Sequence, residues 1–133
     1  MDQLSVFRTI LVNAVRAKHK FAVVNGTKMN KRMLDVMKEE GYISEYSEVK
    51  NSKFKKFKVY FNIFMSPVGY RYAFKDMKQI SKPGLKNYKK HNEIFHVQNG
   101  KGSSIVSTSQ GVMEGSKARK SKLGGEHLLN IYS

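Results

Sequence analysis

The spacing of apolar residues changes from helical to alternating along the first half of the chain, and this change restricts the folds available to it. Near the N-terminus, apolar residues recur three or four positions apart: Leu4, Phe7, Leu11 and Val15. This spacing predicts an amphipathic helix over about 3–18, with Asp2 as its N-cap. Between Phe57 and Phe64, apolar residues recur at every second position, which is typical of a β-strand. The sequence therefore predicts a fold with both helices and strands.

Turn-forming residues define a second helix in the N-terminal half. Residues 21–24 predict a short strand that ends at Asn25-Gly26. Thr27 then is the expected cap of a helix that stops at Gly41, where glycine adopts the left-handed conformation readily. The side chains that this helix is expected to bury are Met29, Met33, Val36 and Met37.

Strands follow this helix. One strand is predicted from Tyr42 to about Val49, and a second over 57–64. The composition of Ser66-Pro67-Val68-Gly69 indicates a turn. A third strand, over 70–74, is expected to pair back on the second through this turn.

The C-terminal half is predicted to be mostly β. Ile80-Ser81-Lys82-Pro83-Gly84 marks a boundary, because proline removes a backbone donor and glycine frees the chain. Short strands are expected at Tyr88–Lys90 and Ile105-Val106, and a closing strand at 127–132. The segment from Met113 to Leu123 predicts a short basic helix.

Together these elements predict an α+β protein of two small lobes. The N-terminal lobe, residues 1–66, is helix, strand, helix and antiparallel sheet. The C-terminal lobe, residues 67–133, is mostly strands with a short helix, and the boundary is placed within 65–80. A length of 133 residues suits such an organisation.

Positive charge is spread over both predicted lobes. The formal net charge is +15 at pH 7. Residues 1–66 carry 13 basic and 6 acidic residues, and residues 67–133 carry 12 and 4. A folded body with this charge attracts polyanions, and nucleic acid is the expected partner. We expect no membrane partner, because neither an amphipathic anchor nor a lipidation motif is visible.

Other classes of protein lack their usual signals. The chain has no cysteine, which excludes disulfides and thiolate zinc sites. No apolar run approaches the ~18 residues of a membrane-spanning helix, and no signal peptide or import sequence is visible. The four histidines lack the spacing of a zinc helix. We therefore expect no enzyme, cofactor, metal site or small-molecule substrate, and a hydrolase using Ser107 or Ser109 is the least favoured alternative.

Three adjacent hydroxyl side chains, Ser107-Thr108-Ser109, follow the predicted strand at Ile105-Val106. Such a triplet can cap the next helix. It can also present short donors and acceptors to the 2′-hydroxyls of an RNA minor groove. Lys82 and Lys86 are candidates for phosphate contacts and Tyr88 for stacking on a base. Spacing alone leaves both readings of the triplet open.

Three linked motifs resemble one family. They are Ile80-Ser81-Lys82-Pro83-Gly84-Leu85-Lys86-x-Tyr88, then Ile105-Val106-Ser107-Thr108-Ser109-x-Gly111-Val112-Met113, then Ala118-Arg119 with Leu123-Gly124-Gly125-Glu126. In order and spacing they resemble the bacterial-type small-subunit ribosomal protein eight family. The N-terminal half is similar more loosely, through Arg16, Lys28 and residues 38–43. A departure at Glu114-Gly115-Ser116 implies that the following helix begins later than in the family.

The resemblance implies a structural constituent of the small ribosomal subunit. Its expected partners are the central domain of small-subunit rRNA, bound directly and early in assembly, and neighbouring small-subunit proteins. The alternative function is translational regulation through a messenger RNA bound by the same surface. The RNA-binding residues expected from charge, chemistry and resemblance are Arg16, Lys28, Lys82, Pro83, Lys86, Tyr88, Ser107, Thr108, Ser109, Lys120, Gly124, Gly125 and Glu126.

Composition suggests where the protein is made. Lysine outnumbers arginine by 20 to 5, as an AT-rich coding sequence would produce. This bias, with no visible import sequence, predicts a mitochondrial ribosome and synthesis inside the organelle. A bacterial cytoplasm or a plastid is the alternative.

Overall fold

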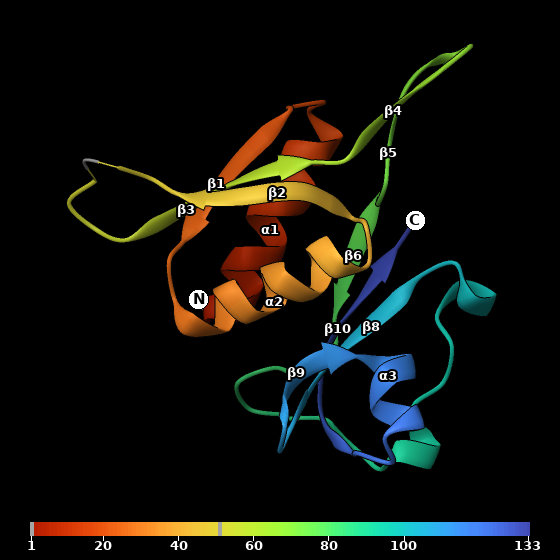
Figure 1. Cartoon of the computed structure of the whole chain (residues 1–133). Coiled ribbons are helices and arrows are strands. Elements are labelled where there is room, and N and C mark those ends of the chain that lie inside the picture. Colours follow the sequence, from red (N-terminus) through yellow and green to blue (C-terminus); the bar gives the residue numbers. More distant parts are fainter. Residues whose placement is uncertain (1, 51) are drawn as a thin grey trace.

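The computed structural model describes residues 2–50 and 52–133 and shows two lobes that share a core (Figure 1). In the N-terminal lobe, two helices pack on one face of an antiparallel sheet. The sheet has the order β1 (Phe21–Asn25), β3 (Lys56–Phe61), β2 (Ile43–Glu48). The helices are α1 (Gln3–Arg16) and α2 (Lys28–Glu39).

Both helices begin and end where the sequence predicts, to within two residues. The Asp2 carboxylate accepts from the Ser5 N–H at 3.0 Å, and the Thr27 hydroxyl oxygen accepts from the Asn30 N–H at 3.1 Å. Gly41 has a φ of +82°, the left-handed conformation expected of a helix stop. The caps predicted for these helices are confirmed.

The prediction that Met29 belongs to the buried stripe of α2 is wrong. Met29 lies exposed, whereas Met33, Val36 and Met37 are buried. Asn30 takes the inward position in the first turn, because its side-chain amide donates to the Asn25 carbonyl at 2.9 Å. This bond turns the first helical turn so that Met29 lies on the outer side.

The strand predicted over 57–64 is divided in two. β3 ends at Phe61, and β4 (Ile63–Ser66) pairs with β5 (Gly69–Tyr72) in a separate antiparallel ribbon. The chain changes direction at Asn62, whose side-chain amide donates to the Gly41 carbonyl at 2.9 Å. The predicted turn and the pairing through it are confirmed. Figure 1 shows the ribbon projecting from the body.

The C-terminal lobe is an antiparallel sheet covered by short helical segments. Its strands follow the order β6 (Asp76–Gln79), β10 (Gly125–Tyr132), β8 (Ser103–Thr108), β9 (Gly111–Glu114), and β7 (Tyr88–Lys89) pairs with one end of β10. α3 (Gly115–Lys120) and two 3-10 turns, η1 (His91–Glu93) and η2 (Gln98–Gly100), complete it. The α+β class and its distribution over two lobes are confirmed.

One strand of this lobe was missed, and one predicted helix start is wrong. β6 was not expected from the sequence. The helix expected from Met113 begins only at Gly115, because Val112 to Glu114 pair with β8 instead. A later helix start is what the departure at Glu114-Gly115-Ser116 implied.

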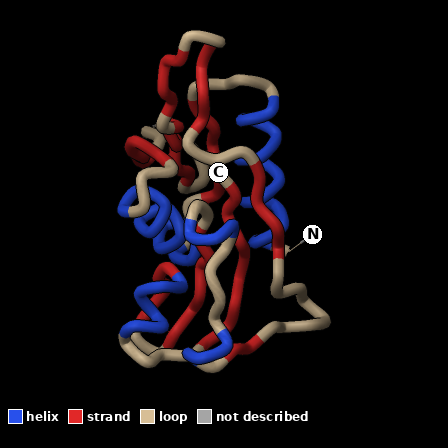
Figure 2. The backbone as a smooth tube through the Cα atoms, turned by 90° about the vertical axis from the view of Figure 1, so that its right-hand side faces the viewer, coloured by secondary structure: helices blue, strands red, loops and turns tan. Residues whose placement is uncertain are grey.

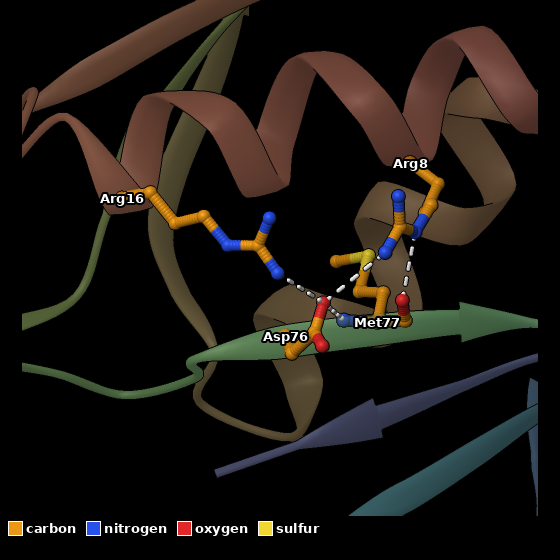
Figure 3. Close-up of polar contacts among 4 residues, drawn as sticks. All are labelled: Arg8, Arg16, Asp76 and Met77. Carbon is orange, nitrogen blue, oxygen red and sulfur yellow. Dashed lines mark hydrogen bonds and ion pairs between the residues drawn. The ribbon is translucent and has the colours of Figure 1, made fainter.

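The lobes are joined by side chains on α1 and β6, which lie side by side (Figure 2). One hydrophobic cluster contains Phe7 of α1, Met77 of β6 and Leu129 of β10. On the surface, Arg8 and Arg16 both pair with the Asp76 carboxylate, at 3.3 and 3.5 Å (Figure 3). The Arg8 Nε–H also donates to the Met77 carbonyl at 2.7 Å. α1 therefore holds the first strand of the C-terminal sheet in place.

Candidate RNA-binding surface

Three of the predicted site residues form a row across three strands at one end of the C-terminal sheet. Glu126 on β10 lies opposite Tyr88 on β7 and opposite Ser107 on β8. Residues opposite one another in antiparallel strands point to the same face of the sheet. Tyr88 is exposed, and Ser107 and Glu126 are half-buried. We call this set the Tyr88–Glu126–Ser107 row.

Glycines allow the three strands to approach one another. A Cβ atom on Gly125 would lie 2.1 Å from the Ser107 carbonyl oxygen, and one on Gly124 would lie 2.6 Å from that of Lys89. Side chains at these positions would push β8 and β7 away from β10. Gly124 and Gly125 thus act on the row through backbone packing.

The hydroxyl triplet lies on the β8–β9 hairpin. The Thr108 hydroxyl donates to the Gly111 carbonyl at 2.7 Å and accepts from the Gln110 N–H at 3.2 Å. Gly111, with a φ of +116°, completes the turn. Thr108 therefore closes the hairpin, while Ser109 lies exposed at its tip.

The alternative that the triplet caps a helix is wrong. The N-cap of α3 is Glu114, whose carboxylate accepts from the Ser116 N–H at 2.7 Å. The whole of β9 separates the triplet from this helix. Its hydroxyls thus serve the hairpin and its surface.

A pinned loop beside the row exposes lysines. The Ser81 hydroxyl donates to the His127 carbonyl at 2.7 Å and accepts from the Asn87 N–H at 3.0 Å, which ties both ends of the loop to β10. Lys82 and Leu85 exchange backbone hydrogen bonds around Pro83-Gly84, at 3.1 and 3.0 Å. Lys82, Pro83 and Lys86 are exposed on this loop, which bulges outward after β6 (Figure 2). Ser81 was absent from the predicted site residues, although its position before Lys-Pro-Gly could have suggested its role.

A buried histidine follows Glu126 on β10, with its side chain on the other face of the sheet. His127 is buried, and its Nε2 lies 2.7 Å from the Asn130 side-chain oxygen. Burial lowers the pKa of His127, the Asn130 hydrogen bond acts in the opposite direction, and Lys89 lowers the pKa further. β10 therefore contains a histidine that favours the neutral form.

The remaining predicted residues lie outside the row. Arg16 and Lys28 belong to the helices of the other lobe, and Arg16 is paired with Asp76. Lys120 of α3 is exposed and lines a groove together with Glu40 and Glu114. Burial raises the pKa of Glu40, and the charges of Glu114 and Glu39 raise it further. Lys117 lines the same groove and acts in the opposite direction on this pKa, so acidic and basic side chains are mixed around Lys120.

Residues 2–50 and 52–133 contain neither a metal-binding cluster nor a membrane-spanning helix. No group of three histidine or acidic side chains is placed to hold a metal ion. No helix in this part of the chain has the length and hydropathy needed to cross a membrane.

Fold and surface define a basic, two-lobed α+β protein whose C-terminal sheet presents hydroxyls, lysines and an aromatic ring at one end. The family model described as ribosomal protein S8 matches residues 2–132. Proteins named "Small ribosomal subunit protein uS8" are similar along nearly the whole length. The one from Leptospira biflexa is 36% identical over 133 residues, 98% of this chain and 97% of the relative. Those from Azobacteroides pseudotrichonymphae and Streptococcus agalactiae are 36% and 34% identical and cover 98% of this chain. The chain belongs to the ribosomal protein S8 family.

Proposed function

We propose that this protein is a structural constituent of the small ribosomal subunit that binds the central domain of small-subunit rRNA directly and supports its assembly. The observation that carries the proposal is the Tyr88–Glu126–Ser107 row in a member of this family. Ser107 belongs to the β8–β9 hairpin, and Tyr88 directly follows the pinned loop over residues 82–87, which we call the lysine loop. Neighbouring small-subunit proteins are the further partners. The role is structural, and no side chain is assigned a chemical step.

Each type of side chain on this surface makes a different kind of contact with RNA. The Ser107 and Ser109 hydroxyls both donate and accept, so they match ribose 2′-hydroxyls in a shallow minor groove. The exposed ring of Tyr88 offers a face to an unpaired base. Lys82 and Lys86 contact phosphates, which sets register and affinity. Glu126 accepts a hydrogen bond from a base amino group or a ribose hydroxyl.

We further propose that the ribosome is mitochondrial. The support is compositional, 20 lysines against 5 arginines. The relatives named above are bacterial, so a bacterial cytoplasm is the competing location. Fractionation of the source cells, with the protein followed by immunoblot, decides between the two: recovery in mitochondrial ribosomes is expected, and recovery in cytoplasmic ribosomes would contradict this placement.

Direct RNA binding is tested with the purified chain and a fragment of its own central-domain rRNA. We expect tight binding that weakens steeply with salt, and a footprint confined to one site. A scrambled duplex of equal length is the control and should bind at least 100-fold more weakly. Equal affinity for both RNAs would contradict the proposal.

A further inference from the structure

The β4–β5 ribbon exposes a group of apolar side chains around its turn. Val68 at its turn is 98% exposed and Met65 is 81% exposed. Phe64 and Tyr70 are also exposed. Met65 and Tyr70 lie opposite each other on one face of the ribbon, whereas Phe64 lies on the other face, opposite Arg71. Exposed apolar side chains grouped at a turn on a folded protein usually mark a contact surface. We call Phe64, Met65, Val68 and Tyr70 the ribbon tip.

The ribbon is attached firmly to the body at its base. Ile63 lies opposite Tyr72, and both pack against the core. The Tyr72 hydroxyl donates to the His19 carbonyl at 2.8 Å. Met65 and Tyr70, opposite each other one step further out, point to the same side as Ile63 and Tyr72. An apolar stripe thus continues from the core onto the projecting part of the ribbon.

Charge distinguishes the ribbon tip from its surroundings. No charged residue occurs from Val59 to Tyr70 in the sequence, although 26% of the chain is charged. Beside the tip, two grooves that Val68 and Tyr70 help to line also contain cationic side chains: Arg16, Lys18, Lys20, Arg71 and Lys75. The surface is therefore an apolar projection surrounded by positive charge.

The apolar tip and the surrounding positive charge together indicate which kind of molecule binds the ribbon. RNA is disfavoured at the two most exposed positions, Val68 and Met65, because their aliphatic side chains offer neither a charge nor a hydrogen bond to a phosphate. A second copy of this chain is disfavoured, because each copy carries a net charge of +15. An apolar pocket on another protein removes Val68 and Met65 from water, and acidic side chains around that pocket complement the cations beside the tip.

We propose that the β4–β5 ribbon inserts its tip into an apolar, acid-rimmed pocket of a neighbouring small-subunit protein. The inference rests on the proposed function, since the partner is sought in the same ribosomal subunit. It gives the N-terminal lobe a protein contact, while RNA binding belongs to the C-terminal lobe.

Site-specific photocross-linking tests the occupant. The full chain is made with p-benzoylphenylalanine at position 68 or, as a second version, at exposed position 85 on the lysine loop, and small subunits are isolated from the source cells. We expect position 68 to cross-link to one protein and position 85 to rRNA. Cross-linking of position 68 to rRNA or lipid, or to nothing, would overturn this inference while leaving the proposed function in place. Absence of both versions from small subunits would overturn the proposed function and this inference with it.

Substitutions measure what the contact contributes. Val68→Asp and Met65→Asp should each lower incorporation into small subunits at least fivefold in competition with the wild-type chain. Affinity for the isolated rRNA fragment should change less than twofold. Phe54→Asp is the matched control, since Phe54 is 68% exposed on the loop between β2 and β3, and it should leave incorporation unchanged. Equal incorporation of all three variants would contradict the proposal.

Discussion

The β8–β9 and β4–β5 hairpins are alike in sequence charge and opposite in what they expose. The turn and most of both strands of each hairpin lie in an uncharged stretch, Gly102–Met113 and Val59–Tyr70 respectively, which ends just before Glu114 and Arg71. The first hairpin pairs with β10 and places Ser109 and Gln110 at its tip. The second projects as a separate ribbon and places Met65 and Val68 there. Hydroxyls suit hydrogen bonding to RNA and aliphatic side chains suit burial in protein, so similar hairpins indicate different partners.

The largest effect is expected where β10 supports the first hairpin. Gly125→Val would place a Cβ atom 2.1 Å from the Ser107 carbonyl oxygen, so β8 and β10 must separate. We expect a loss of about 2–3 kcal/mol in unfolding free energy, as in overpacked sites, together with loss of specific RNA binding. Urea denaturation measures the first quantity and a filter-binding assay the second. Gly84→Ala is the control, because a Cβ atom there meets nothing within 4 Å; a comparable loss in this variant would contradict the packing argument.

Removing a hydroxyl from the tip of the first hairpin should affect binding without affecting folding. Ser109 is exposed, so Ser109→Ala should leave the unfolding free energy unchanged. Its affinity for the cognate rRNA fragment should fall by about 1–2 kcal/mol if the hydroxyl forms a buried bond with RNA. Affinity for scrambled duplex should not change. An equal loss of affinity for both RNAs would show that Ser109 does not contribute to specific recognition.

Removing the Thr108 hydroxyl should, in contrast, lower the stability of the fold. Thr108→Val removes the hydroxyl that donates to Gly111 and accepts from Gln110. The expected cost is about 1 kcal/mol of unfolding free energy, measured by thermal or urea denaturation. Unchanged stability would show that Gly111 alone shapes this turn. The analogous bond in the second hairpin, from the Ser66 hydroxyl to the Gly69 carbonyl at 2.6 Å, is exposed, and Ser66→Ala should cost less.

A lysine of the C-terminal lobe, which contains the first hairpin, should affect the salt dependence of RNA binding. Lys120→Ala should reduce the slope of log affinity against log salt by about one if Lys120 contacts a phosphate. Val68→Asp, on the second hairpin, should leave that slope unchanged. Lys120 shares a groove with Glu40 and Glu114. An unchanged slope for Lys120→Ala would therefore show that this lysine faces these carboxylates and does not contact a phosphate.

The smallest expected effect concerns pH. Burial lowers the pKa of His127 in the folded chain below its unfolded value of about 6.5. The unfolded chain therefore binds more protons, and the His127 contribution to stability is retained above this pH and is lost as pH falls below it. Unfolding free energies measured between about pH 7 and 5 should decrease, and His127→Gln should flatten this dependence. His19→Gln, at an exposed position, is the control and should retain the wild-type dependence.

Local features of the chain were predictable because they depend on neighbours in sequence. The caps at Asp2 and Thr27 and the turn at Gly69 follow from side chains and backbones within three or four residues. Misjudged features depend on distant partners. Met29 lies outside because Asn30 bonds to Asn25, and Met113 lies in a strand because it pairs with Val106.

The candidate site shows the same division. The lysine loop and the hydroxyl triplet could be recognised as motifs, and the uncharged ribbon between Val59 and Tyr70 is visible in the sequence. The position of Ser81 before Lys-Pro-Gly could suggest a role in the loop, but its partner His127 and the pairing of Arg16 with Asp76 depend on residues far apart in the sequence. The predicted role of each site residue in RNA binding, and the division at 66/67, stay predictions.

By itself, the sequence determined most of the elements, the basic character and the resemblance to the family, because periodicity, charge and linked motifs are local or additive properties. Tertiary structure decided that Tyr88, Glu126 and Ser107 stand in one row, since only strand pairing brings β7 and β8 to the two sides of β10. It also decided that one uncharged hairpin is held against a sheet and the other projects into solvent. That difference arises from backbone hydrogen bonds between segments far apart in the chain, which residue patterns do not specify.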